Sequence, residues 1–380
     1  MAGIYIHIPF CRQACHYCDF HFSTSLKSKK DFLNALKKEI SLQKNYLGTK
    51  NISTIYLGGG IPSVLSKEEI LEIFSELAKH FSIDKNAEIT LEANPDDLSK
   101  EKLKELSQTP INRLSIGTQS FSDEDLKFLN RIHSSKDAIK SVKNAQEANF
   151  KNITIDLIYG IQTLTNKQWK KNIEQALAMD VKHISCYSLT VEPRTAMHSF
   201  IEKGKIKNVD TKKSADQFEI LIGEMKKNNF IHYEISNFGK ENFFSKHNSN
   251  YWKGVSYLGL GPSAHSYDGI SRQWNVRSNS VYISSLTKNK IPSEKEILSE
   301  EQKYNEYVMT SLRTIWGTDF NYITDSFPER FSANFEKESA PYLKNKMMVK
   351  EKNIFSLTDK GKLFADKIAS DLFITGVIQK

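Results

Sequence analysis

Three cysteines near the start of the chain, Cys11, Cys15 and Cys18, carry the clearest chemical signal in the sequence. Their spacing, C-x3-C-x2-C, follows an apolar stretch at residues 4–8 that predicts a strand. A tetrahedral structural metal ion takes four protein ligands, so this triplet is one ligand short. A [4Fe–4S] cluster held by three thiolates keeps one iron free to bind the amine and carboxylate of a small molecule. The triplet therefore predicts an open iron–sulfur cluster.

A zinc site is the competing interpretation, because short cysteine spacings often bind that ion. The only other cysteine, Cys186, lies in the apolar stretch at 183–189 and is expected to be a small core residue. His16 or His21 could still complete a tetrahedral set of ligands. The spacing alone leaves both metals open.

Glycines and polar residues recur where the predicted strands end, which is where ligands bind in parallel β/α folds. Any one of these motifs could be a helix cap, and a GGG run alone is more often a tight turn. Their recurrence at one edge of the sheet predicts a binding site there. The motifs are Gly58-Gly59-Gly60-Ile61-Pro62, Glu92-Ala93-Asn94-Pro95, Gly117-Thr118-Gln119-Ser120 and Asp156-Leu157-Ile158-Tyr159-Gly160.

Short apolar stretches alternate with amphipathic ones over about the first 240 residues, which predicts parallel strands joined by helices. Ser66, followed by Glu69, forms a capping box at the start of one helix. Six units are too few for an eight-unit barrel, so we expect an α/β fold with a partial, open (β/α)6 TIM-like barrel. The predicted strands are 4–8, 52–57, 88–92, 113–116, 153–158 and 183–189, and the predicted helices are 29–46, 67–81, 100–106, 123–129, 136–148 and 167–179.

A chain of 380 residues exceeds what a single core usually supports, so further units are expected beyond the barrel at 1–240. Residues 241–293 are rich in aromatics and glycine and predict a connecting segment. Residues 294–380 predict a mostly helical domain, whose end resembles the wing and last helix, of about fifteen residues, of a winged-helix fold. Since fold does not determine function, a docking role is expected there rather than DNA binding.

The composition, with 39% hydrophobic and 26% charged residues, is that of an ordinary globular protein. The net charge of +8 comes from lysines spread over segments such as 27–44 and 203–213, which indicates a solvated surface rather than a nucleic-acid site. An acidic ligand is compatible with that charge. No apolar stretch is long enough to span a bilayer, no secretory signal is visible, and the cysteines form no disulfide framework. A cytoplasmic protein that is not integral to a membrane is expected.

The cysteine triplet with the preceding Tyr5, the GGG motif and the strand-end polar residues resemble the radical S-adenosylmethionine (SAM) superfamily. In that superfamily the open iron binds SAM, and an electron from the cluster cleaves its sulfonium. The resemblance implies that Gly59 meets the methionine amino group and that Asp156 and Gln119 meet the ribose. Arg131, taken alone, would be assigned to a surface helix end. The implied cluster ligands are Cys11, Cys15 and Cys18, and the implied SAM site comprises Tyr5, Gly59, Gly60, Ile61, Glu92, Gln119, Arg131 and Asp156.

Within the superfamily, the whole chain resembles the branch of oxygen-independent coproporphyrinogen III oxidases and the related haem chaperones of the HemW family. The oxidase pattern has a fourth cysteine where this chain has Phe20. The chaperone pattern H-N-x-x-Y-W matches residues 247–252, which begin with His247. The resemblance thus implies haem as a ligand, with His247 as its iron ligand. It also implies an acceptor protein for the haem, with a membrane respiratory enzyme as the expected acceptor.

Several alternatives stay open from the sequence. The chain departs from the family pattern at Ile61, where Thr is usual, and at 161–163, where Pro-Gly-Gln is commoner. His133, His198 and His265 remain further candidates for the haem ligand. The rival function is oxidative decarboxylation of coproporphyrinogen III, and a third is a zinc-stabilised module with a winged-helix DNA contact. Productive SAM cleavage, covalent haem attachment and a homodimer are also left open.

Overall fold

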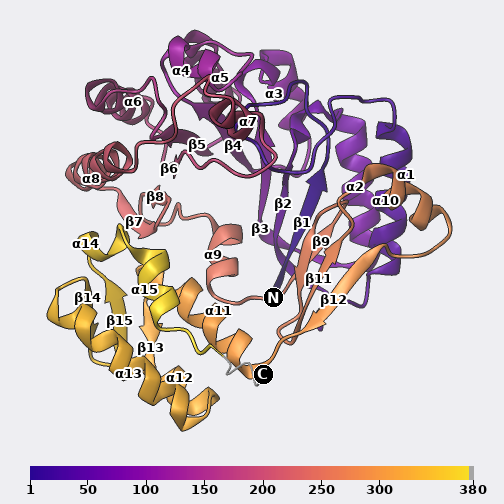
Figure 1. Cartoon of the computed structure of the whole chain (residues 1–380). Helices are drawn as coiled ribbons and strands as arrows, with labels where there is room; N and C mark the ends of the chain where they lie inside the picture. Colours follow the sequence, from indigo (N-terminus) through magenta and orange to yellow (C-terminus); the bar gives the residue numbers. More distant parts are fainter. Residues whose placement is uncertain (376–380) are drawn as a thin grey trace.

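The computed structural model describes residues 1–375, and a row of six parallel strands forms its centre (Figure 1). All six predicted strands are present, several of them longer than the sequence indicated. Neighbours along the chain are neighbours in the sheet. The strands are β1 (Ala2–Ile8), β2 (Asn51–Gly59), β3 (Ser82–Ala93), β4 (Arg113–Gln119), β5 (Asn152–Tyr159) and β6 (His183–Ser188).

Helices follow the strands and cover their outer face, as the β/α alternation predicts (Figure 1). The expected capping box is formed: Ser66 accepts from the Glu69 backbone, and the Glu69 carboxylate accepts from the Ser66 backbone. Two short 3-10 turns follow β2 and β3, at Pro62–Val64 and Pro95–Asp97. The helices are α1 (Lys29–Leu42), α2 (Lys67–His80), α3 (Lys100–Leu106), α4 (Asp123–Phe128), α5 (Ser135–Glu147), α6 (Asn166–Ala178), α7 (Ala196–Glu202) and α8 (Thr211–Lys227).

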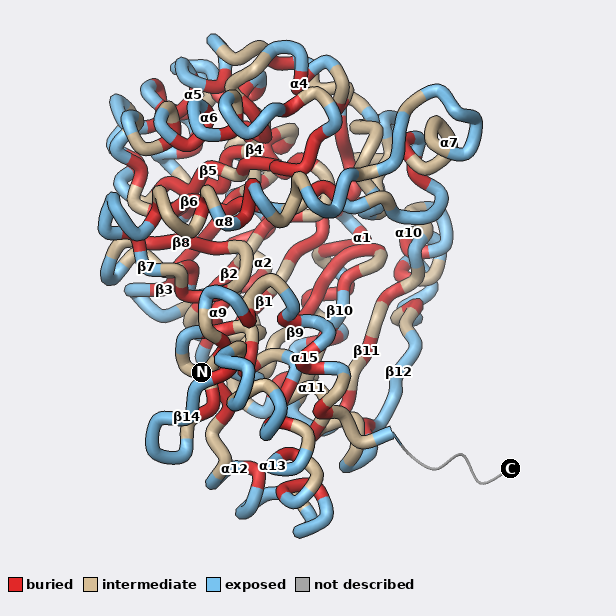
Figure 2. The backbone as a smooth tube through the Cα atoms, turned by 60° about the vertical axis from the view of Figure 1, so that its left-hand side comes forward, coloured by how far each residue is buried: buried red, intermediate tan, exposed pale blue. Residues whose placement is uncertain are grey.

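The central strands have one apolar face and one polar face. In β4, Leu114 and Ile116 are fully buried in the core, whereas Arg113 and Ser115 line a cavity on the other side. Successive side chains on a strand point to opposite faces, so this alternation places the apolar residues under the helices. Figure 2 shows the result, with buried strands inside and exposed outer sides on the helices.

Residues 241–297, which run past the connecting segment predicted at 241–293, extend the central sheet at one edge. Strand β9 (Tyr257–Leu260) pairs in parallel with β1, and β10 (His265–Tyr267), β11 (Ser271–Asn275) and β12 (Ser293–Ile297) add antiparallel strands. The same segment contains α9 (Lys246–Trp252) and α10 (Asn279–Thr287).

At the other edge, β8 (Asn237–Gly239) pairs with β6, and β7 (Ile231–Glu234) pairs with β8. The strand order among the described residues is β12-β11-β10-β9-β1-β2-β3-β4-β5-β6-β8-β7, so β12 and β7 stay apart and the barrel is open, as predicted.

The C-terminal domain has its own core and a small sheet in the order β13-β15-β14. The predicted wing corresponds to the β14–β15 hairpin. The prediction of one final helix of about fifteen residues was wrong, because the chain forms two short helices there. Gly361, a poor helix former, lies in the first of them. The elements are α11 (Glu300–Leu312), β13 (Thr318–Asp319), α12 (Phe320–Ser326), α13 (Glu329–Lys344), β14 (Met348–Glu351), β15 (Ile354–Leu357), α14 (Asp359–Lys362) and α15 (Ala365–Asp371).

Backbone hydrogen bonds join this domain to the edge of the large sheet. Ile235 N donates to Arg313 O at 3.1 Å, and Ile315 N donates to Tyr233 O at 2.9 Å. None of the helices in residues 1–375 combines the length and the apolar character that crossing a membrane requires.

Candidate functional site

A cavity of about 560 Å³ lies on the inner face of the six central strands. It is lined by the three clustered cysteines and by most of the residues implied as a SAM site: Gly59, Gly60, Ile61, Glu92, Gln119, Arg131 and Asp156. Tyr5 and His247 are not among its lining residues. The strand-end motifs thus meet around one space, as the sequence predicts.

The loop that carries the cysteines is fixed by backbone hydrogen bonds. Cys11 N donates to Ser23 O at 3.0 Å, and Ser23 N donates to Pro9 O at 2.8 Å, so the two ends of the loop are closed on each other. Cys18 N donates to Cys15 O at 3.3 Å. The loop therefore holds three thiols at the carboxyl end of β1.

The three thiols can be compared with the ligand geometry of a single metal ion and of a cluster. All three are free and line the cavity. Within residues 1–375, no group of three or more His, Cys, Asp or Glu side chains converges on one point that could hold a metal ion. Zinc needs thiolates about 2.3 Å from a common centre, whereas each thiolate of a [4Fe–4S] cluster binds a different iron.

Each histidine that could complete a zinc site has one ring nitrogen engaged, and the other nitrogen of each ring has no hydrogen-bond partner among the described residues. His16 Nδ1 lies 3.0 Å from Phe128 O, and His21 Nε2 lies 2.7 Å from Asn279 Oδ1. Cys186 is 1% exposed in the hydrophobic core, as expected. Burial raises the pKa of Cys11 to about 12 and that of Cys18 to about 11, so bound metal would be needed to stabilise the thiolates.

The glycine motif brings β2 against the cysteine loop. Gly60 N donates to Ile8 O at 2.9 Å, and Ile61 N donates to Phe10 O at 2.7 Å. A Cβ on Gly60 would lie 2.5 Å from Ile8 O, so only glycine fits there. Gly59 has φ +99°, and its N–H donates to Glu92 Oε2 at 3.2 Å. These three N–H groups therefore already donate hydrogen bonds within the protein. The backbone carbonyls of the motif are the groups that can accept from an ammonium group.

Two buried carboxylates face the same space. Tyr56 donates to Glu92 Oε1 at 2.6 Å, and Ser115 donates to Asp156 Oδ2 at 3.0 Å. Burial raises the pKa of Glu92 to about 7 and that of Asp156 to about 6, and the negative charge of Asp156 adds to the shift at Glu92. Both carboxylates would be stabilised in ionised form by a ligand that offers hydroxyl or ammonium donors.

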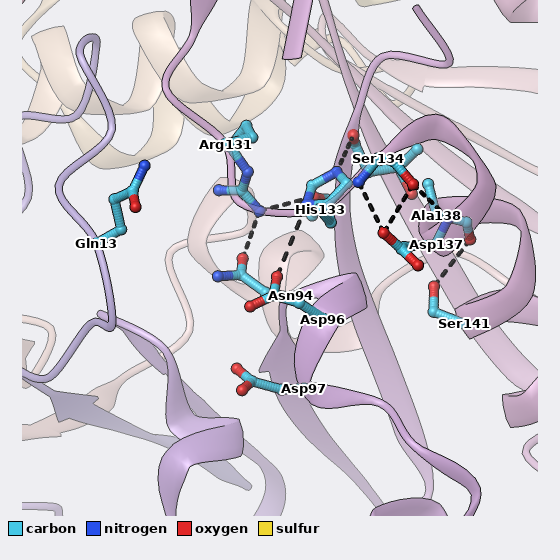
Figure 3. Close-up of polar contacts among 12 residues, drawn as sticks. Gln13, Asn94, Asp96, Asp97, Arg131, His133, Ser134, Asp137, Ala138 and Ser141 are labelled. Carbon is cyan, nitrogen blue, oxygen red and sulfur yellow. Dashed lines mark hydrogen bonds and ion pairs between the residues drawn. The ribbon is translucent and has the colours of Figure 1, made fainter. Parts of the chain in front are cut away.

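Arg131 lines the cavity rather than a surface helix end. Figure 3 shows its guanidinium directed toward Asn94. Its guanidinium donates to Gly117 O at 2.9 Å and to Asn94 Oδ1, and it lies 3.4 Å from the Cys15 sulfur. These contacts link the cysteine loop to the ends of β3 and β4. A positive charge beside Cys15 also suits an anionic cluster.

His247 is enclosed below the cavity, 2% exposed. Its Nδ1 lies 2.9 Å from Thr54 Oγ1, and its Nε2 lies 2.8 Å from the Tyr251 hydroxyl. Burial lowers the pKa of His247 to about 3, so the ring is neutral. In this conformation both ring nitrogens already have partners.

The other histidine candidates and Tyr5 also lie outside the cavity lining. His133 Nε2 faces Thr118 O at 3.1 Å, with Asp96 near its other nitrogen (Figure 3). His198 lies 3.4 Å from Glu202, and His265 stacks on Trp274. Tyr5 lies 3.2 Å from His7 Nδ1 and stacks on Tyr56.

Some cavity residues were not predicted. They include Thr90, Arg113, Ser115, His183 and Tyr187, which lie on the inner faces of β3, β4 and β6. The alternation Arg113-Ser115-Gly117-Gln119 in β4 was the available signal, because strands buried on both faces are usually apolar throughout. Phe20, which replaces the fourth cysteine of the oxidase pattern, also lines the cavity and is 68% exposed.

Family models match two parts of the chain. A model described as "Radical SAM superfamily" matches residues 5–176, and one described as "HemN C-terminal domain" matches residues 298–364. The first range contains the cysteine loop and β1–β5, and the second contains most of the C-terminal domain.

Curated relatives match the chain over nearly its whole length. The haem chaperone HemW of Bacillus subtilis (strain 168) is 34% identical, covering 97% of this chain and 98% of the relative. The haem chaperone HemW of Lactococcus lactis is 32% identical, covering 94% and 93%. Among solved structures, the coproporphyrinogen III oxidase HemN of Escherichia coli, described as a radical SAM enzyme, has a TM-score of 0.84 at 22% identity and covers 98% of this chain and 89% of that one. This structural likeness shows a shared fold.

Proposed function

Because the chain belongs to the HemW family of haem chaperones, within the radical SAM superfamily, we propose that it binds haem and transfers it to an acceptor protein. The observation that carries this proposal is a match of 34% identity over nearly the full length of a haem chaperone, on a chain whose three cysteines line one cavity.

We propose that Cys11, Cys15 and Cys18 hold a [4Fe–4S] cluster and that SAM occupies the adjoining cavity. When bound, the cluster can supply an electron to the sulfonium of SAM. The backbone carbonyls of the glycine motif would accept from the methionine ammonium, and Asp156 and Gln119 would meet the ribose. Support comes from the convergence of these residues on one space and from the superfamily match.

The side chains around the cavity would orient SAM and screen it from water. Glu92 is fixed by Tyr56 and by Gly59 N, and Arg131 is fixed by Asn94 and Gly117. A ligand that enters such a prearranged site loses little free energy in ordering it.

His247 is our proposed haem ligand, as the H-N-x-x-Y-W motif implies. Coordination of iron by Nε2 requires the Tyr251 hydroxyl to leave, because that hydroxyl now lies 2.8 Å from the nitrogen. Haem binding at His247 would therefore require the Tyr251 side chain to rotate away from the imidazole. We further propose a cytoplasmic location, a respiratory enzyme as the haem acceptor, and a homodimer when the cluster is present.

An anaerobic haem titration of cluster-reconstituted protein, followed by absorbance, tests the function. Wild type is expected to bind one haem per chain saturably, and His247→Ala is expected to bind it more weakly. His80→Ala, at a partly exposed histidine of α2 outside the cavity, is the matched control and should bind as wild type does. If wild type shows no specific binding, the chaperone proposal fails. Product analysis with coproporphyrinogen III, SAM and a reductant would then test the oxidase alternative.

A further inference from the structure

The cavity continues along the barrel axis, past the residues implied in SAM binding, to the start of the strands. Its lining there includes Arg113, the first residue of β4, and His183, the first residue of β6. Ser245 and Asn248, from the start of α9, also line it. The cysteines follow the carboxyl end of β1, so this inner end lies opposite the proposed cluster.

Arg113 is a buried cation without an anionic partner at this inner end. The residue is 1% exposed, and no Asp or Glu in residues 1–375 lies within ion-pair distance of it. Its hydrogen-bond partner is the side-chain oxygen of Asn152. A guanidinium has five N–H donors and keeps its charge at any physiological pH, so burying it without an anion is costly.

The polar groups around Arg113 leave room for an acceptor. Thr90 pairs with Arg113 across β3 and β4, is fully buried, and its hydroxyl has no hydrogen-bond partner among the described residues. His183 is bonded through both nitrogens, to Thr154 Oγ1 at 2.6 Å and to the Tyr233 hydroxyl at 2.7 Å. Asp156 is near enough for its charge to interact with Arg113, but its Oδ2 accepts from Ser115 at 3.0 Å.

We propose that Arg113 and the Thr90 hydroxyl form a subsite for a carboxylate group of the ligand in this cavity. A guanidinium binds a carboxylate through two parallel hydrogen bonds, and a hydroxyl beside it can donate a third. The proposal rests on the proposed function, which supplies two sources of a carboxylate: a haem propionate and the methionine carboxylate of SAM. The position opposite the cysteines favours the propionate, because the open iron is expected to take the methionine end of SAM.

The test compares ligands that differ only in the carboxylate, on cluster-reconstituted protein under anaerobic conditions. Haem is compared with haem dimethyl ester, and SAM with decarboxylated SAM, for wild type, Arg113→Gln and Arg113→Lys. Arg330→Gln, which removes an exposed arginine in the C-terminal domain, is the matched control. For each variant the quantity measured is the ratio of the dissociation constants of the paired ligands, which cancels any general loss of folding.

Wild type is expected to bind haem about ten- to one-hundredfold more tightly than its dimethyl ester, and this ratio is expected to fall about tenfold in Arg113→Gln, which keeps only the contribution of the second propionate. Arg113→Lys should keep part of the difference, because it keeps the charge without the planar fork. If Arg113→Gln lowers only the ratio for SAM and decarboxylated SAM, the result would support the subsite and assign it to the carboxylate of SAM.

The proposal is overturned if both ratios are the same in wild type and in Arg113→Gln, whether or not Arg113→Gln is less stable. If wild type binds haem but the ratios do not differ between wild type and Arg113→Gln, the chaperone function stands and only the subsite is contradicted. Absence of haem binding by wild type would instead contradict the chaperone function, and the SAM pair would then decide the subsite.

Discussion

The imidazole of His247 stacks on the phenol ring of Tyr56, with the ring centroids 5.1 Å apart and the planes inclined by 27°. On the other side of this contact, Tyr56 donates to Glu92 Oε1 at 2.6 Å. Within the H-N-x-x-Y-W motif on α9, Asn248 lines the cavity directly, whereas His247 contacts it through the ring of Tyr56. The ring of Tyr56 thus lies between His247 and Glu92 and contacts both of them.

Tyr56→Phe should keep the stacking contact and remove the hydrogen bond to Glu92. That hydrogen bond favours the ionised carboxylate, so its loss should raise the pKa of Glu92 further. We expect SAM affinity at pH 7 to fall about tenfold and to recover partly at pH 8.5, when Glu92 ionises again. Isothermal titration calorimetry at the two pH values measures this. Tyr322→Phe, at an exposed tyrosine of the C-terminal domain outside the cavity, is the control, and a loss that does not change with pH would contradict the role of the carboxylate.

The unliganded protein should lose stability as the pH rises through the pKa of Glu92. Burial raises this pKa from 4.5 to about 7, so the folded state binds the proton more tightly than the unfolded state does. The resulting stabilisation is complete below pH 4.5 and disappears as the pH passes 7. Between pH 5 and 8 the unfolding temperature of Glu92→Gln should therefore fall less than that of wild type. Glu241→Gln, at an exposed position, should follow wild type, and parallel curves for all three proteins would show that Glu92 does not titrate as described.

Much of the fold and of the candidate site could be predicted from the sequence, because its signals are local. Six apolar stretches separated by amphipathic ones predict six parallel strands, and the glycine and polar residues at their ends predict which edge of the sheet holds the site. Seven of the eight residues implied in SAM binding line the same cavity as the cysteines.

Other features depend on packing between distant segments. Tyr5 and His247 lie outside the cavity lining because the ring of Tyr56 contacts both of them, which no local pattern reveals. The alternation in β4 indicates the inward face of Arg113, but the residues beside it, Thr90 on β3 and Asn152 on β5, follow from the strand register. The pairing of β9 with β1 joins segments far apart in the chain, and a connecting segment was all that composition could indicate.

The iron content of cysteine variants should distinguish the clustered cysteines, as cluster ligands, from Cys186. Cys186 packs in the core on the face of β6 away from the cavity, so Cys186→Ala should retain the full iron content and lose about 1 kcal/mol of stability. Cys15→Ser should lose most of the iron, because serine is a poor ligand for a cluster. Iron and sulfide per chain after anaerobic reconstitution give the answer. Iron loss in Cys186→Ala at unchanged stability would make this cysteine a ligand.

Glu39 should be a principal anchor between α1 and the connecting segment. It is fully buried and accepts from Tyr282 at 2.6 Å, from Gly261 N at 2.8 Å and from Asn275 at 2.6 Å. Glu39→Ala leaves three buried donors without an acceptor, so we expect a loss of about 3 kcal/mol in the free energy of unfolding. Urea unfolding measures it, with Glu72→Ala on the exposed side of α2 as control. A loss no larger than that of the control would contradict the anchoring role.

The connecting segment should also determine how long the cluster is retained. Asn279 Oδ1 lies 2.7 Å from His21 Nε2, and Arg277 donates to the backbone oxygen of Asp19, so two neighbouring side chains hold the end of the cysteine loop. These contacts are partly exposed, and their removal should cost less than about 1 kcal/mol of global stability. Without them the loop around Cys18 should open more often, because local opening depends on the few contacts that close a loop.

The double variant Arg277→Ala/Asn279→Ala should therefore lose cluster absorbance severalfold faster than wild type in the presence of a chelator, with an unchanged midpoint of urea unfolding. Arg330→Ala, which removes an exposed ion pair in the C-terminal domain, should lose it at the wild-type rate. Equal rates for all three proteins would mean that the cysteine loop is held by its own backbone hydrogen bonds alone.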